Sequence, residues 1–181
     1  MKKKVLQITE TAVMLALLVS LQALTKPMGQ LVTGSCVNAV LAVSALVGGL
    51  ASGLTVALIS PVLAFLLGIA PQVLTVPAIM AGNCIYVIML SLLADKTGKN
   101  LIKQVIAWVA AAVSKFAVLY AIVVWLICGV LSQNLLASGV MKEPMLKALP
   151  ATFSWPQLFT ALIGGAVALL IVPVVRKALH K

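Results

Sequence analysis

The chain has 181 residues, of which 63% are hydrophobic and 9% are charged, and its mean hydropathy is +1.21. This composition excludes a water-soluble globular domain and predicts an integral membrane protein. The net charge of +10 does not indicate a nucleic-acid partner, because the basic residues flank apolar runs instead of forming a patch on a soluble module.

Six apolar runs follow one another along the chain, and a bilayer crossing needs about 20 such residues. We therefore expect an all-α integral membrane protein, with about six transmembrane helices in one bundle and a single domain over residues 1–181. The second and third runs are short and are joined by the uncharged stretch 48–53, so one re-entrant segment with five crossings is the alternative. The expected helices are Val5–Leu24, Ser35–Leu50, Gly53–Leu67, Leu74–Leu93, Leu101–Leu131 and Leu158–Val175.

Basic residues gather on alternate connections, which predicts an orientation. With six crossings, nine of the thirteen fall on the side of the termini, whereas five crossings would destroy this asymmetry. By the positive-inside rule, both termini are then cytoplasmic. The first side carries Lys2, Lys3, Lys4, Lys96, Lys99, Lys103, Arg176, Lys177 and Lys181, and the other carries Lys26, Lys142 and Lys147.

The outer connections are expected at Thr25–Gly34, Gly68–Val73 and Ser132–Gln157. The last is longer than a hairpin requires and contains Gln133, Asn134 and Trp155. Long loops in compact folds are commonly lids or binding segments. A lid and a solvated connector both remain open interpretations.

Catalytic and energy-coupling motifs are absent from the sequence. There is no phosphate-binding loop of the type that hydrolyses ATP, and one histidine with three acids leaves no metal-ligand cluster or carboxylate pair. Glu10 and Asp95 fall near the ends of predicted helices, where they are poorly placed for a proton relay. We therefore expect no enzyme activity, no metal and no cofactor in this chain, and an external source of energy.

Three polar residues stand inside apolar helices and are candidates for a ligand site. Lys115 lies about 21 Å along its helix, where a cation is costly unless it meets an anion or a polar cavity, or extends outward to the headgroups. Asn83 and Tyr86 are three residues apart and share a helix face. Either could bridge helices instead of binding a ligand. The predicted substrate-binding residues are Asn83, Tyr86, Lys115, Gln133, Asn134 and Trp155.

Small residues form a stripe on the first helix, with Ala12, Ala16 and Ser20 on one face. Such stripes allow close helix approach in lipid. They serve either packing within the bundle or docking of a partner protein, and the sequence physics leaves both open.

These features together resemble an S component, the membrane substrate-binding subunit of an energy-coupling factor (ECF) vitamin transporter. The resemblance covers essentially the whole chain and rests on its size, topology, basic start and the Ala-x-x-x-Ala motif of Ala12 and Ala16. It implies capture of a vitamin or related micronutrient from outside, and release inside after the subunit topples in the bilayer.

The resemblance also implies partners: a transmembrane coupling subunit, contacted by Ala12 and Ala16, and two cytoplasmic ATPase subunits that use the ATP. The alternative function is a self-contained secondary transporter or channel for a small solute.

Overall fold

The computed structural model describes residues 2–69, 72–95 and 100–179, and within them every regular element is a helix. Five helical segments are long and apolar enough to cross a membrane, and α3, with 17 residues, is shorter. The elements are α1 (Lys2–Thr25), η1 (Lys26–Met28), α2 (Gln30–Val47), α3 (Leu50–Leu66), η2 (Val73–Thr75), α4 (Val76–Leu93), α5 (Leu101–Leu119), the π-helical η3 (Tyr120–Val130), α6 (Ser132–Ala137), α7 (Glu143–Phe153) and α8 (Trp155–Ala178).

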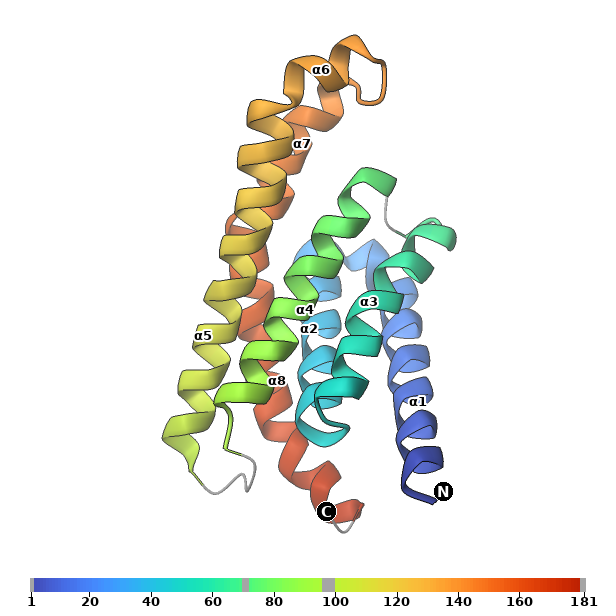
Figure 1. Cartoon of the computed structure of the whole chain (residues 1–181), viewed down its shortest axis with the longest axis vertical. Helices are drawn as coiled ribbons and strands as arrows, with labels where there is room; N and C mark the ends of the chain where they lie inside the picture. Colours follow the sequence, from blue (N-terminus) through green and yellow to red (C-terminus); the bar gives the residue numbers. More distant parts are fainter. Residues whose placement is uncertain (1, 70–71, 96–99, 180–181) are drawn as a thin grey trace.

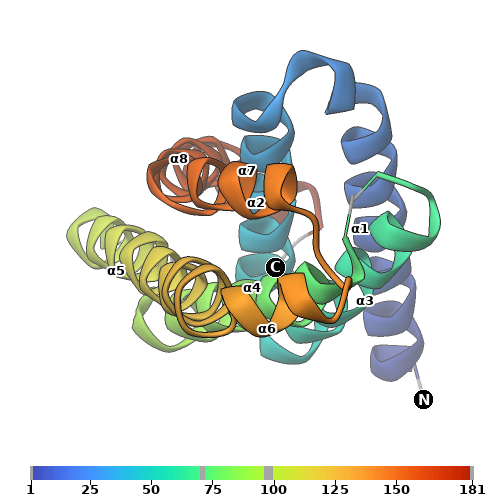
Figure 2. The same ribbon diagram turned by 90° about the horizontal axis from the view of Figure 1, so that it is seen from above.

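The helices form one bundle in which α2 packs most closely with α8, and α4 with α5. The beginning of α1 and the end of α8 lie at the same end of the bundle, and α6 lies at the opposite end (Figure 1). Seen from above, α7 lies over α2 and α8, while α1 and α3 stand on the other side of α2 (Figure 2). Both termini at one end agree with an even number of crossings.

The break between α2 and α3 depends on two glycines. Gly48 ends α2, and Gly49 adopts a φ of +86°, a left-handed conformation that only glycine enters without cost. Two separate helices therefore follow one another here. This favours six helices over the single re-entrant segment, although α3 is short for a crossing.

Two outer connections differ from the predicted loops. The second helix begins at Gln30, not Ser35, and the segment expected as the loop Ser132–Gln157 is mostly helical as α6, α7 and the start of α8. The prolines Pro144 and Pro156 are compatible with these helices because they occupy first turns, where proline lacks only an unneeded donor. Pro77 occupies the first turn of α4 in the same way.

The main core surrounds the middle of α2. Leu18, Leu41, Val56 and Tyr86 are each 0% exposed there. A second cluster joins η3 to α7 and includes Leu119, at the end of α5, and Phe153. The first cluster joins α1, α2, α3, α4, α5 and α8, and the second attaches α7 to the end of the bundle away from the termini.

Candidate functional site

A cavity of about 380 Å³ opens at the end of the bundle away from the termini. Its walls come from the end of α1, the first turns of α2, the connection before α4, the middle of α4 and α5, and α7 with the start of α8. This volume is at the low end of the range for small-molecule pockets. Most of its lining surface is apolar, but eleven of its twenty lining residues carry polar side chains.

Lys115 forms part of the deep wall. It is 3% exposed, and its Nζ donates to Asn38 Oδ1 at 2.5 Å and to Asn83 Oδ1 at 2.7 Å. Nζ also lies 5.5 Å from the centre of the Tyr86 ring, within the range of a cation–π contact. The side chain therefore turns into the bundle and does not extend toward the headgroups, so the outward interpretation of Lys115 is wrong.

Small residues on α4 and α5 make this arrangement possible. Ala111 and Ala112, one turn before Lys115, are 0% exposed and let α5 pack closely in the core. A Cβ on Gly82 would meet the Leu119 side chain at 2.7 Å, so glycine lets α4 approach α5 beside Asn83. Close packing of this kind drives helix association in lipid, and here it brings a cation and two amides together.

Amide side chains continue around the cavity above Lys115. Gln72 and Gln157 are 8% and 7% exposed, and Gln157 Nε2 donates to the Thr152 backbone carbonyl at 3.2 Å. Gln22 also lines the cavity, and its Oε1 is buried without a hydrogen-bond partner among the described residues. These groups offer donors and acceptors to the polar parts of a bound solute.

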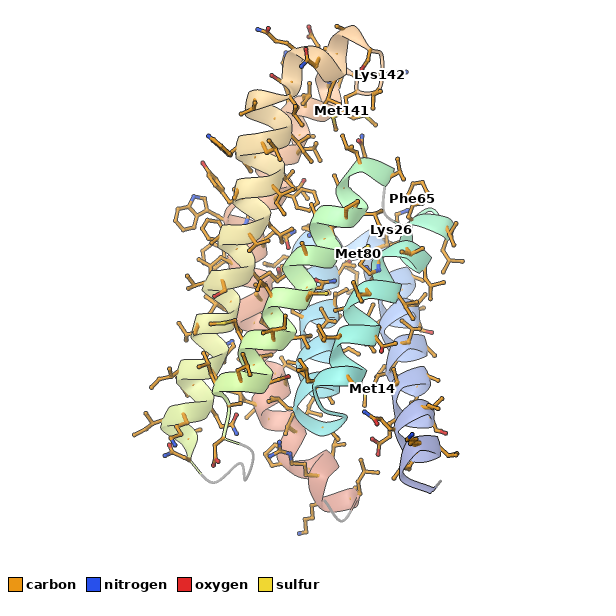
Figure 3. All side chains as sticks on the ribbon, viewed as in Figure 1. Met14, Lys26, Phe65, Met80, Met141 and Lys142 are labelled. Carbon is orange, nitrogen blue, oxygen red and sulfur yellow. The ribbon has the colours of Figure 1, made fainter. Side chains whose placement is uncertain are left out.

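The cavity mouth is bordered by Lys26, whose Nζ donates to the Gly68 carbonyl at 2.6 Å. This bond ties the end of α1 to the end of α3. Figure 3 shows Lys26 where α1 ends and Lys142 before α7, both away from the end of α8. Glu143 and Lys147 on α7 form an exposed ion pair of 3.8 Å, which contributes little to stability.

Residues 6–176 match the model of the family described as "ECF transporter, substrate-specific component". The chain belongs to this family. No match was found among the curated proteins or among the solved structures. As a member of this family, the chain is a substrate-specific transporter subunit in a membrane, and the family is not one of enzymes.

The residues predicted for substrate binding in this S component divide into two groups. Asn83 and Lys115 line the cavity together, and Tyr86 lies beside them but is 0% exposed, with its hydroxyl donating to the Ala161 carbonyl at 3.3 Å. Tyr86 therefore bridges α4 and α8, which is the alternative to ligand binding that the sequence left open. Its role in binding stays a prediction.

Gln133, Asn134 and Trp155 do not converge on the cavity as predicted. The first two are exposed on α6, beyond η3, because the segment folds as a helix and not as an inward loop. Trp155 is 63% exposed and stacks on Phe116 with ring centres 5.5 Å apart. None of the three belongs to the cavity lining.

Sequence reasoning missed several residues of the S component's cavity. Asn38 is not among the predicted binding residues, yet its side-chain oxygen accepts from Lys115 and it lines the cavity. Gln22, Gln72 and Gln157 and the face of α7 were not singled out. A polar side chain within or beside each apolar run was the available signal, but spacing along the chain does not indicate which helices meet.

The small-residue stripe on α1 is open to the surroundings. Ala12, Ala16 and Ser20 are all exposed, whereas Leu18, on the opposite face, is 0% exposed. The stripe therefore does not pack within this chain, and the internal-packing interpretation is wrong. Docking of a partner on this face stays a prediction.

Proposed function

We propose that this S component captures a vitamin or related micronutrient from outside the cell in the cavity above Lys115. It then delivers the solute inward with a transmembrane coupling subunit and two cytoplasmic ATPase subunits. The cell membrane of a prokaryote is the proposed location, with both termini inside. The observation that carries the proposal is the polar-lined cavity, which opens at the end of the bundle away from the basic termini.

Two further observations support dependence on partners. The sequence has no phosphate-binding loop, and none of its three acids lines the cavity, so neither ATP hydrolysis nor a carboxylate proton relay is available at the site. The exposed Ala12 and Ala16 leave a face on α1 where a second membrane protein can approach closely. Energy therefore comes from a complex and not from this chain.

Reconstitution into liposomes tests the proposal. The chain should bind its solute by itself, detected as a rise in unfolding temperature across a vitamin panel, because ligands that bind the folded state stabilise it. Uptake of the stabilising compound should require the coupling subunit, the ATPases and ATP. Uptake by the chain alone under an ion gradient would instead establish the alternative, a self-contained secondary transporter or channel.

A further inference from the structure

The cavity contains positive charge without a negative side chain of its own. Lys26 and Lys115 line it, whereas the whole sequence has only three acids. Glu10 is near the start of α1 and Asp95 follows α4, both toward the end of the termini, and Glu143 is an exposed residue of α7 paired with Lys147. None of the three acids lines the cavity beside Lys115, so a counter-ion for this side chain would come from a bound molecule.

In its protonated form, Lys115 retains one unused donor. It has three N–H groups, and Asn38 and Asn83 accept two of them. Neutral amide oxygens lower the cost of burial but do not cancel the charge, and an uncompensated cation inside a membrane is expensive. Since Lys115 lines the cavity, its third N–H is available to a bound acceptor.

Asn83 supplies a second donor at the same place. Lysine has no acceptor, so the amide oxygen of Asn83 must face Nζ and its Nδ2 must point elsewhere. The Nδ2 of Asn38 donates to Thr160 Oγ1 at 3.3 Å, whereas that of Asn83 donates to none of the residues that the structure describes. Asn83 also lines the cavity. A charged donor and a neutral donor are thus adjacent and open.

We propose that Lys115 and Asn83 bind the two oxygens of a carboxylate, so that the transported solute is a small monocarboxylic acid. This inference rests on the proposed function and names its substrate class. A planar carboxylate presents two oxygens to the two donors, and its single charge matches the one buried cation. A phosphate dianion fits less well, because Lys26 is exposed at the mouth and already bound to Gly68.

Matched acid and amide pairs test the inference on the purified full chain in detergent. Suitable probes are biotin and biotinamide, nicotinate and nicotinamide, lipoate and lipoamide, and 4-aminobenzoate and 4-aminobenzamide. We expect an acid of the panel to bind about 100-fold more tightly than its amide, the range expected for one lost charged hydrogen bond. The readouts are the ligand-induced rise in unfolding temperature and the Kd from calorimetry.

Asn83→Asp gives a readout that a purely structural role of Lys115 would not produce. The new carboxylate lies beside Nζ and supplies the missing counter-ion, so the ligand-free protein should unfold at a higher temperature while its affinity for the acid falls about 100-fold. Lys115→Met should likewise abolish the preference for acid over amide. Lys142→Met, an exposed change outside the cavity, is the matched control and should leave the preference intact.

The outcomes separate the two proposals. Equal binding of acid and amide, or unchanged acid affinity in Asn83→Asp, overturns the carboxylate inference even if ATP-dependent uptake is found. Binding and ATP-dependent uptake of a neutral compound does the same and leaves the proposed function standing. If no probe binds and the complex transports none of them, both proposals fail.

Discussion

Two adjacent glycines of α8 determine how closely the helices around the cavity approach. A Cβ on Gly164 would contact the Ser35 carbonyl and lie 2.7 Å from Asn38 Cβ. A Cβ on Gly165 would contact the ring of Trp108 and lie 3.0 Å from the Tyr86 hydroxyl. The Trp108 indole instead donates to the Leu162 carbonyl at 2.9 Å. The absence of two side chains thus holds α8 against α2 and α5, and keeps Asn38 beside Lys115.

Gly164→Ala should therefore destabilise the protein. A better helix former gains up to about 1 kcal/mol, but forcing a methyl group against the α2 backbone costs about 1–3 kcal/mol and commonly more where backbone must move. We expect a lower unfolding temperature in detergent and weaker ligand binding, since Asn38 would shift. Gly129→Ala is the control, because its Cβ would meet nothing closer than 3.7 Å. Equal stability of the two variants would show that α8 can move away from α2 without cost.

At the residue scale, only part of the candidate site could be predicted from the sequence. Lys115 was recognisable because a cation in an apolar run requires an explanation, and Asn83 and Tyr86 share a face through helical spacing. Asn38 contacts Lys115 across 77 positions of sequence, and this depends on which helices pack together. Gln72 could not be assigned for a similar reason, since it is buried in a connection whose path the tertiary fold determines.

At the scale of elements, α7 is the largest difference from the sequence prediction. Met145, Ala148 and Thr152 line the cavity, and Leu149 and Phe153 are 6% and 7% exposed. The segment is thus an amphipathic helix that covers the cavity. The 11 residues of α7 include two prolines, so the sequence alone indicates a helix only weakly. The helix is stabilised by its contact with η3. The lid interpretation of this segment fits its position, whereas a free connector does not.

The exposed stripe of α1 leads to a prediction about assembly. Ala12→Trp or Ala16→Trp should block close approach of the coupling subunit and reduce uptake at least about tenfold, because small residues are what allow helix backbones to meet in lipid. Ligand binding by the isolated chain should not change, since neither residue lines the cavity. Co-purification with the coupling subunit and the Kd of the isolated chain are the two measurements.

Leu170→Trp is the control for the α1 variants. Leu170 is 77% exposed on α8, so tryptophan there adds bulk to the surface without blocking the proposed face of α1. Loss of ligand binding in Ala12→Trp as severe as the loss of uptake would contradict docking. Equal loss of uptake in Leu170→Trp would show that any bulk on the outside of the bundle is harmful.

At the scale of the whole molecule, described basic residues and the cavity lie toward opposite ends of the bundle, as the predicted orientation requires. Lys103 at the start of α5 and Arg176 near the end of α8 lie at the end of the bundle where α1 begins, and Arg176 Nη2 donates to the Leu46 carbonyl at 2.7 Å. Lys26 and Lys142 lie away from that end. These described residues are therefore distributed as the order of charges predicts, while Lys96, Lys99 and Lys181 lie outside the described residues. This charge pattern depends only on the order of the charges and the number of helices, which the sequence shows. The cavity depends on which helices pack together, so it could not be predicted.

This orientation can be tested by labelling cysteines in intact cells. In a chain whose Cys36, Cys84 and Cys128 are replaced by alanine, Lys142→Cys should react with a membrane-impermeant maleimide from outside. Lys4→Cys and Lys177→Cys should react only after permeabilisation, because the positive-inside rule places both ends in the cytoplasm.

Labelling of Lys177→Cys but not Lys4→Cys in intact cells would mean an odd number of crossings. Since α3 has only 17 residues, that result would indicate that α2 and α3 together cross the membrane only once. External labelling of both ends would show that the molecule has the opposite orientation in the membrane. The cavity would then face the cytoplasm, which would contradict capture from outside.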